Sequence, residues 1–355
     1  MINILGLTRY DSNGPSSRYR FYQFLPYLDK EGFDISIFPL FNKKYINNLY
    51  FDQRVRTLLN PLSAYFRRTY KLLSDRSYDL VWMEKEALPW IPASIEKLLW
   101  KASVPYVIDY DDAIFHRYDQ HNNILVKAVL SKKISQLMSR CLVVVAGNKY
   151  IADYAERAGS QKVVILPSVV DTNLYVGNVP QEKKSFTIGW IGSPSTSRHL
   201  QVVASALSEV CKSRDVRFSA IGAQEKDVAE IPGKVISWNE ATEIEELNRF
   251  DVGIMPLPNT SWERGKCGFK LIQYMACGLP VIASPVGMNK EIVDHGVNGF
   301  LAIKTSEWIK YIKLLKNDSE FREKMGKAGQ EKVKEKYSLQ SATPKLVKLL
   351  REVVV

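Results

Sequence analysis

Hydrophobic residues occur along the first half of the chain in short, nearly continuous runs separated by longer stretches with helical spacing. These runs are Ile2–Leu7, Ile35–Phe38, Leu80–Met83, Tyr106–Ile108, Leu142–Ala146 and Val163–Leu166. Helix-length segments such as Ser17–Lys30 lie between most of them. Continuous apolar strands that alternate with helices are typical of a parallel sheet covered on both faces. The pattern therefore predicts a doubly wound α/β domain.

The same alternation starts again in the second half. Strands are predicted at Phe186–Ile191, Val216–Ile221, Val235–Ile236, Val252–Met255 and Pro280–Ala283, and helices at about Ser197–Cys211, at Lys270–Cys277 and from Glu307 onward. The intervening segment 167–184 contains proline, glycine and a charged run, which are signals of a domain boundary. We therefore predict two domains, residues 1–178 and 179–337, with a helix at about 338–355 that packs back on the first.

Composition narrows the classes of protein. None of the four cysteines forms a C-x-x-C pair, which argues against a zinc or disulfide framework and favours a reduced, cytoplasmic setting. The first apolar run meets Arg9 almost at once, so no secretory signal is predicted. The net charge of +11 indicates partners such as phosphates, acidic lipids or nucleic acid.

Part of this charge lies in residues 42–76. Basic residues alternate there with aromatic ones: Lys43, Lys44, Tyr45, Tyr50, Phe51, Arg54, Arg56, Tyr65, Phe66, Arg67, Arg68, Tyr70, Lys71 and Arg76. Aromatic rings and basic side chains together suit the surface of an anionic membrane. The same pattern is also typical of a charged helix whose aromatic side chains pack into the domain. Both interpretations stay open.

Two loops that follow predicted strands are suited to an anion. Ligands of parallel sheets bind beyond the carboxyl ends of the strands. In the loop TRYDSNGPSSR, Gly14 permits a tight turn, and Ser16 or Ser17 can cap the next helix. In GWIGSPSTSR, Gly192 and Ser193 would let the backbone approach a diphosphate. Capped turns without a ligand would have the same residues.

A third loop follows the strand Val252–Met255 and is richer in charge. It contains Glu263, Arg264, Gly265, Lys266, Gly268 and Lys270 before a helix that carries Gln273. The density of charge at the carboxyl end of a strand favours a binding site over a solvated loop. A fourth loop, DYDDAIFH, supplies Asp109, Asp111, Asp112 and His116. Its D-x-D spacing superficially matches a manganese-binding motif, but aspartates that cap the turn beside a locally packed histidine would have the same residues.

The segment GFKLIQYMACGLPVIASPVGMNKEIVDHGVNGFL, Gly268–Leu301, resembles the donor-binding segment of the family 4 glycosyltransferases. The loops at Gly14–Arg18, Ile165–Asp171 and Gly192 agree more loosely. The resemblance implies the GT-B fold, in which two doubly wound, Rossmann-like domains face each other across a cleft. It also implies a nucleotide-sugar donor and no required metal.

The chain departs from the family pattern at the paired glutamates, which fall on Gly265 and Gln273 here. Gln273 can still hydrogen-bond ribose hydroxyls, and Glu263 is our candidate for the missing sugar-binding glutamate. The expected donor-binding residues are Gly14, Ser16, Gly192, Ser193, Arg198, Lys266, Gly268, Phe269, Lys270 and Gln273. The expected catalytic residues are His116, Asp111, Asp112 and Glu263, and the expected acceptor-side residues are Ser17, Arg18 and Asp109.

We therefore expect a glycosyltransferase that uses a UDP- or GDP-sugar, retains the anomeric configuration and needs neither cofactor nor metal. The expected acceptor is a glycan or a lipid-linked molecule, as in bacterial surface polysaccharide synthesis, and the expected location is cytoplasmic or peripheral on the inner face of the membrane. One alternative is a nucleotide-sugar epimerase of similar fold. Another is a basic nucleic-acid or polyanion binder, although no groove-reading motif is present. Neither half has the G-x-G-x-x-G pattern of a dinucleotide oxidoreductase.

Overall fold

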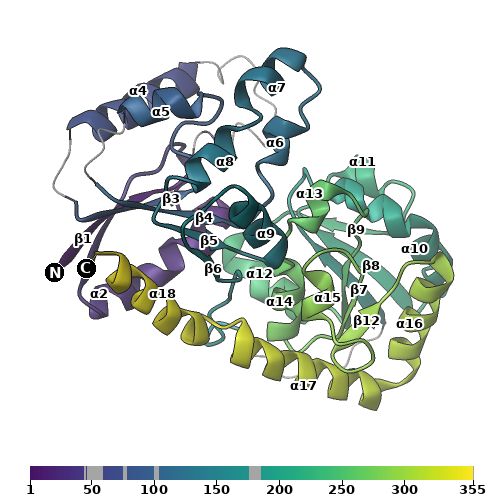
Figure 1. The fold of residues 1–355 in the computed structure, drawn as a ribbon. Helices are drawn as coiled ribbons and strands as arrows, with labels where there is room; N and C mark the ends of the chain where they lie inside the picture. The colour runs from purple at the N-terminus through teal and green to yellow at the C-terminus, as the bar shows by residue number, and fades with distance from the viewer. Residues whose placement is uncertain (44, 46–58, 75–77, 100–103, 176–184, 355) are drawn as a thin grey trace. The chain divides into compact units, whose positions relative to one another are not determined.

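The computed structural model describes residues 1–43, 45, 59–74, 78–99, 104–175 and 185–354. The chain forms two compact units. The first consists of Met1–Ser168, Gly265–Cys267 and Ala342–Val355, and the second of Val169–Arg264 and Gly268–Ser341. Each unit contains a six-stranded sheet (Figure 1). The prediction of two doubly wound α/β sheets is confirmed. The first stretch of the first unit ends at Ser168, whereas the sequence predicted a boundary at residue 178.

The sheet of the first unit has the strand order β2-β1-β3-β4-β5-β6, with every pair parallel. Its strands are β1 Ile2–Leu7, β2 Phe33–Ile37, β3 Leu80–Glu84, β4 Tyr106–Tyr110, β5 Val143–Ala146 and β6 Val163–Ile165. Its helices are α1 Pro15–Arg20, η1 Tyr22–Phe24, α2 Leu25–Lys30, α4 Leu59–Ser74, α5 Ala93–Leu99, α6 His116–Asp119, α7 Ile124–Leu130, α8 Lys133–Met138 and α9 Lys149–Arg157. The single helix expected at Ser17–Lys30 is thus three shorter pieces, because Phe21 leaves the helical region at φ −126°.

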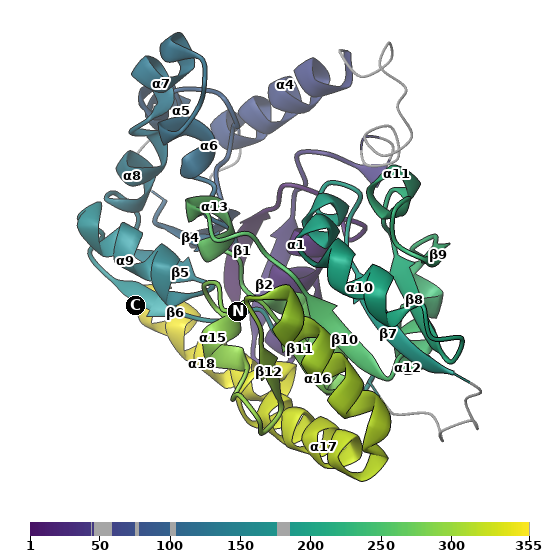
Figure 2. The same cartoon turned by 90° about the vertical axis from the view of Figure 1, so that its right-hand side faces the viewer.

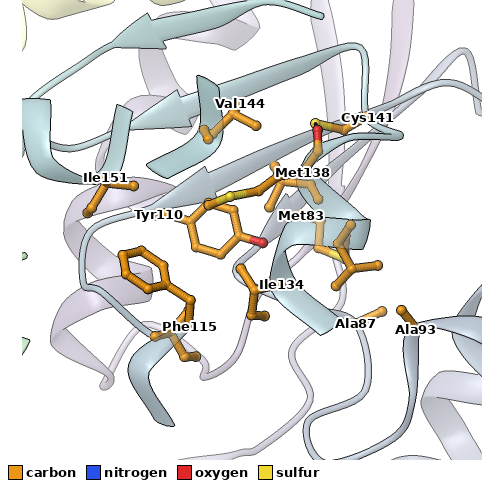
Figure 3. Packing of buried hydrophobic residues seen from close by; sticks show 14 of the residues in the cluster. Met83, Ala87, Ala93, Tyr110, Phe115, Ile134, Met138, Cys141, Val144 and Ile151 are labelled. Atoms are coloured by element: carbon orange, nitrogen blue, oxygen red, sulfur yellow. Dashed lines mark hydrogen bonds between the residues drawn. The ribbon is translucent and has the colours of Figure 1, made fainter. Parts of the chain in front are cut away.

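The main core of the first unit lies on one face of this sheet. Alternate strand residues, such as Met83, Tyr110 and Val144, point to that face and meet the helices α8 and α9. Figure 3 shows the side chains of Tyr110 and Met138 next to each other in this cluster, with Phe115 and Ile151 on the same side. On the opposite face Phe21 stacks on Trp82, with ring centroids 4.0 Å apart. Helices on both faces explain why the inner strands β3, β4 and β5 are nearly continuous apolar runs, whereas the edge strand β2 contains Asp34 and Ser36.

The helix α18, Leu339–Val354, closes the first unit from the other end of the chain. Arg351 Nη2 lies 2.8 Å from Glu31 Oε2, at the end of α2, and Lys162 Nζ lies 2.7 Å from Glu352 Oε2. Figure 1 shows α18 running beside α2. These ion pairs are exposed, so the buried side chains Leu346 and Leu350 supply most of the stabilisation.

The sheet of the second unit has the order β12-β11-β10-β7-β8-β9 and is also parallel. Its strands are β7 Phe186–Ile191, β8 Val216–Ile221, β9 Gly233–Ile236, β10 Val252–Met255, β11 Val281–Ala283 and β12 Gly299–Leu301. Its helices are η2 Ser197–Val203, α10 Ala204–Val210, α11 Glu225–Val228, η3 Glu240–Thr242, α12 Glu243–Asn248, α13 Ser261–Arg264, α14 Phe269–Ala276, α15 Asn289–Ile292, α16 Thr305–Asn317 and α17 Ser319–Lys336. Strand β12 was not expected from the sequence.

Neighbouring residues of these strands enter two different cores. Ile254 packs with the residues of α10 and α16, whereas Met255 packs with those of α14 and α17. Figure 2 shows α10 and α16 side by side. Successive side chains of a strand point to opposite faces, so a sheet buried on both sides has two separate cores.

Among the described residues, none of the helices combines the length and the apolar character that a membrane span requires.

Candidate active site

In the first unit, three polar side chains meet beyond the carboxyl ends of the adjacent strands β1, β3 and β4. Lys85 Nζ lies 2.8 Å from Asp111 Oδ1 and 3.0 Å from Ser16 Oγ. Ser16 Oγ donates a hydrogen bond of 2.5 Å to Asp111 Oδ2. The structure therefore joins two predicted residues, Ser16 and Asp111, through a lysine that sequence reasoning missed.

The charges of this group stabilise one another. Burial lowers the pKa of the Lys85 ammonium, but Asp111 and Glu84 outweigh this effect and raise the pKa above its ordinary value. Burial likewise acts to raise the pKa of Asp111, but Lys85, Ser16 and Arg20 lower it below its ordinary value. Asp111 is thus a carboxylate at neutral pH, and its side chain is 14% exposed.

The first aspartate of the D-x-D sequence is bound differently. Asp109 is buried at the end of β4 and accepts two hydrogen bonds from Arg20, at 2.7 and 2.9 Å. Arg20 also donates to the Leu166 carbonyl oxygen at 2.7 Å. Burial raises the pKa of Asp109 to about 6, although Arg20 opposes the shift. This buried bidentate pair ties α1 to the sheet and leaves Asp111 and Asp112 as the accessible carboxylates of the loop.

The other two residues expected on the acceptor side, Ser17 and Arg18, and the expected catalytic residue His116 already have protein partners. Ser17 is buried, and its Oγ donates to Glu84 Oε2 at 2.6 Å. Arg18 lies over the ring of Tyr19, with its guanidinium carbon 4.7 Å from the ring centroid. His116 hydrogen-bonds through Nδ1 to Asp119 at 2.9 Å and through Nε2 to the Tyr150 hydroxyl at 2.8 Å.

A second buried charge cluster follows β3 directly. Lys133 Nζ lies 2.7 Å from Glu86 Oε2 and 3.3 Å from Glu96 Oε1, and the Tyr118 hydroxyl donates to Glu86 at 2.8 Å. Burial raises the pKa of Glu96 to about 7. The sequence signal for both missed clusters was the charged run Glu84–Glu86, placed immediately after an apolar strand.

Residues Gly265–Cys267 belong to the first unit. Lys266 Nζ lies 3.7 Å from Asp112 Oδ1, and the Gly265 carbonyl oxygen accepts a hydrogen bond of 2.8 Å from Asn148. A β-carbon on Gly265 would lie 2.3 Å from that of Ala113, so a larger residue does not fit. Lys266, which we expected at the donor diphosphate, is therefore paired with Asp112. Gly265, where the family has its first glutamate, lies too close to Ala113 for any side chain.

In the second unit, the loop after β7 meets the start of α14. Lys270 Nζ lies 4.1 Å from the centroid of a Trp190 ring and 3.5 Å from Thr196 Oγ1. A β-carbon on Gly192 would lie 2.6 Å from Lys270 Nζ. The predicted residues Gly192 and Lys270 are thus neighbours beyond the carboxyl end of a strand, where a bare backbone and an ammonium group suit a diphosphate.

Other predicted donor residues surround this point to different degrees. The Ser193 backbone N–H donates to Thr196 Oγ1 at 3.2 Å, which shapes the turn. Gly268 has the left-handed φ of 66° and precedes Phe269, the first residue of α14. Arg198 is exposed on η2.

Gln273 is buried on α14 and has a carboxylate partner that the sequence did not suggest. Its Nε2 donates to Glu243 Oε1 at 2.7 Å and to the Tyr175 hydroxyl at 3.3 Å. Glu243 also accepts a hydrogen bond of 2.5 Å from Trp238 Nε1. The amide is therefore oriented by α12, which begins at Glu243.

Glu263, the candidate sugar-binding residue, is buried on α13. Its Oε1 lies 3.2 Å from His199 Nε2, and its Oε2 accepts a short hydrogen bond from Thr260. These contacts fix the orientation of the carboxylate. In the part of the chain that the structure describes, no three His, Cys, Asp or Glu side chains gather as a metal site would require. Independence from metal remains a prediction.

Residues 185–318 match the family model described as glycosyl transferases group 1. No curated protein matches the sequence. Among solved structures, HepE from Anabaena in complex with UDP-glucose has a TM-score of 0.73 and 16% identity, with 99% of this chain and 100% of that chain covered. Sucrose-phosphate synthase from Thermosynechococcus elongatus has a TM-score of 0.74 and 14% identity, with 99% of each chain covered.

A glycosyltransferase from Rickettsia africae ESF-5 is similar over 99% of this chain and 98% of that chain, with a TM-score of 0.70 and 14% identity. Identities this low show the fold alone. The family match spans the predicted site residues Gly192, Glu263, Lys270 and Gln273 of the second unit. The chain thus has the fold of the GT-B glycosyltransferases, and its residues 185–318 match the glycosyl transferases group 1.

Proposed function

We propose that the chain transfers a sugar from a nucleoside diphosphate-sugar, with UDP as the first candidate nucleotide, to a hydroxyl of a glycan or lipid-linked acceptor. The observation that carries the donor assignment is the approach of Lys270 to the bare backbone of Gly192. An ammonium group at this place stabilises the negative charge that grows on the leaving diphosphate. The complex of HepE with UDP-glucose supports UDP over GDP.

The donor is tested by thermal unfolding of the full chain with UDP, GDP, ADP and UDP-glucose. A ligand at a hundred times its Kd stabilises the native state by about 2.7 kcal/mol, which raises the melting temperature measurably. We expect UDP and UDP-glucose to stabilise the chain and ADP to leave it unchanged. Stabilisation by none of the four at millimolar concentration would contradict the donor assignment.

Retention of the anomeric configuration and independence from metal are parts of the same proposal. They rest on the resemblance at Gly268–Leu301. Proton NMR of the product distinguishes an α- from a β-linkage, and assays in excess chelator test the metal. A nucleotide sugar that changes configuration without any acceptor would instead identify an epimerase.

We also propose that the acceptor is lipid-linked, as in bacterial surface polysaccharide synthesis, and that the first unit binds an anionic membrane through α4. Leu62, Phe66 and Tyr70 recur every four residues on this helix and are 71%, 75% and 65% exposed. The helix contains three basic residues and no acidic one. An exposed apolar stripe beside basic side chains suits the interface of an anionic bilayer.

The structure changes which residues should be tested for membrane binding. Arg68 is buried and donates to the carbonyl oxygens of Thr8 and Phe38, so it cannot face lipid. Arg54 and Arg56 lie outside the described residues. Tyr65 packs inward and donates to the Pro89 carbonyl oxygen, whereas Phe66 is exposed.

Sedimentation with vesicles of phosphatidylglycerol and phosphatidylcholine at low salt tests this proposal. We expect the wild-type chain to sediment, and the triple variant Leu62→Ser, Phe66→Ser, Tyr70→Ser to remain in solution with unchanged UDP binding. The matched control replaces exposed apolar residues elsewhere, Leu174→Ser, Val297→Ser and Ile303→Ser. A wild-type chain that does not sediment would refute the membrane proposal and leave the donor proposal intact.

A further inference from the structure

The group Ser16, Lys85 and Asp111 has a feature that an ordinary surface ion pair lacks. Lys85 has a left-handed backbone, with φ of 64°, and Trp90 in the same connection has φ of 63°. They are the two non-glycine residues with positive φ in the described ranges. A non-glycine residue in this region is strained, and such strain persists where the surrounding contacts hold it. At Lys85 these contacts are the hydrogen bond of 2.9 Å from its backbone N–H to the Asp109 carbonyl oxygen and the contacts of its ammonium with Asp111 and Ser16.

We propose that Lys85 is a positioning residue for Asp111, and that the oriented Asp111 carboxylate accepts a hydrogen bond from the acceptor hydroxyl. Lys85 contacts Asp111 Oδ1 at 2.8 Å, and Ser16 contacts Oδ2 at 2.5 Å. With one partner on each oxygen, the plane of the carboxylate is fixed. The second half of the proposal rests on the proposed function, because it requires an acceptor.

The burial of the two charges explains why Lys85 is needed. The side chains of Lys85 and Asp111 are 8% and 14% exposed. A carboxylate removed from water is stable only with a charged or hydrogen-bonded partner. Without Lys85, burial would dominate and raise the pKa of Asp111. A protonated Asp111 would be a poorer acceptor for a hydroxyl hydrogen.

Several other groups act on Asp111 and stay in place when Lys85 is replaced. Arg20 favours its ionised form. Cys267 Sγ donates to the Asp111 carbonyl oxygen at 2.9 Å. The other charged groups near this loop are Asp109, which is paired with Arg20, Glu84, which lies 3.9 Å from Lys85 Nζ, and Asp112, which is paired with Lys266. Asp109 and Asp112 have cations of their own, and Lys85 Nζ, at 2.8 Å, is the cation in direct contact with the Asp111 carboxylate.

The direct test follows the Asp111 carboxyl carbon by NMR in the full chain labelled with [13C]aspartate, and Asp111→Asn identifies its resonance. We expect the carboxyl of Lys85→Met to titrate about one pH unit or more above that of the wild type, and the carboxyl of Lys85→Arg to titrate with the wild type. The control Lys149→Met removes an exposed ion pair with Asp153 and should leave Asp111 unchanged. An unchanged titration in Lys85→Met would overturn the proposal.

Transfer assays with UDP-glucose provide the functional arm. For Lys85→Met we expect the acid limb of kcat/KM to move to higher pH, with activity that recovers at least tenfold between pH 6 and pH 8. A uniform loss at every pH, or a Lys85→Arg variant as impaired as Lys85→Met, would contradict a positioning role. If the wild type binds no nucleotide sugar, the proposed function fails, while the NMR result still decides the role of Lys85.

A variant that fails to fold does not end the test. Lys85→Met combined with Asp111→Asn removes both charges, so neither of the two is left as an unpaired buried ion, and Glu84 keeps its hydrogen bond from Ser17. If Lys85 acts only through Asp111, this double variant will have the same kcat/KM as Asp111→Asn alone. A further tenfold loss in the double variant would assign Lys85 a separate role and overturn the proposal.

Discussion

The side-chain amide of Gln273 donates a hydrogen bond of 2.7 Å to the carboxylate of Glu243, and both residues are buried. The position of Gln273 is that of a glutamate in the family it resembles. A glutamate there would bring two carboxylates to hydrogen-bonding distance, and one of them would have to take up a proton.

We expect Gln273→Glu to lower the free energy of unfolding by about 1–3 kcal/mol at neutral pH, because a buried hydrogen bond is replaced by like-charge repulsion. The exchange Gln273→Glu with Glu243→Gln should recover most of this loss. Urea unfolding at pH 5 and pH 8 measures both effects. A single variant as stable as the wild type at pH 8 would show that this contact contributes little.

Replacement of Lys270 tests the diphosphate site. We expect Lys270→Ala to lower kcat/KM by about a hundred- to a thousandfold, which corresponds to about 2.7–4 kcal/mol of transition-state stabilisation. Arg198→Ala should have a smaller effect, because Arg198 is exposed. The control is Lys212→Ala, whose side chain is 74% exposed. If Arg198→Ala and Lys270→Ala lower kcat/KM equally, the diphosphate does not lie closer to Lys270 than to Arg198.

A β-carbon at Gly192 would lie 2.5 Å from the Trp190 ring and 2.6 Å from Lys270 Nζ. We expect Gly192→Ala to displace Lys270 and to weaken UDP binding at least tenfold, as measured by calorimetry. Ser193→Ala is the comparison, because it alters the same turn without entering that space. Equal UDP affinity in Gly192→Ala and the wild type would argue against a close approach of the diphosphate.

The Arg20–Asp109 pair predicts a pH-dependent stability. Removing one member of a buried ion pair costs about 3–5 kcal/mol, so Arg20→Met should be strongly destabilised at pH 8. Burial already raises the pKa of Asp109 to about 6, and the loss of Arg20 would raise it further. Between the ordinary carboxyl pKa and this raised pKa, Asp109 of the folded variant is protonated, whereas the same carboxyl in the unfolded chain is ionised.

The stability of Arg20→Met should therefore increase as the pH falls from 8 toward 5, relative to the wild type. Denaturant unfolding at several pH values measures this slope. The double variant Arg20→Met with Asp109→Asn should lose the slope, because it has no carboxyl group at this position. A pH-independent deficit in Arg20→Met would mean that Asp109 is not the group that takes up the proton.

The hydrophobic pattern predicted most of the fold because the strands are buried on both faces. Runs such as Val252–Met255 have no polar position, and the structure has a strand with these bounds. The pattern missed β12, since Gly299–Leu301 is too short to be recognised. It also predicted one helix at Ser197–Cys211, where the chain forms the 3-10 helix η2 before α10.

The candidate site was predictable only in part. Strand ends pointed to Ser16, Asp111, Gly192 and Lys270, and the structure places all four in loops or helix starts beyond strand ends, because parallel strands bring the loops after them to one edge of a sheet. Their roles stay predictions. Pairings between distant residues were not visible. Lys85 and Ser16 are 69 residues apart, and Gln273 and Glu243 are 30 apart. One sequence gives no reason to pair them.

The first unit is assembled from segments far apart in the sequence, since residues 342–354 of α18 belong to it together with residues 1–168. During synthesis the β1–β6 sheet leaves the ribosome long before this helix does. Until then the surface that Leu346 and Leu350 cover is exposed, and Glu31 and Lys162 have no partners from α18. The second unit, whose residues all precede α18 or form its first turn, can complete its core earlier. In the order of biosynthesis, the unit that begins first is the one that finishes last.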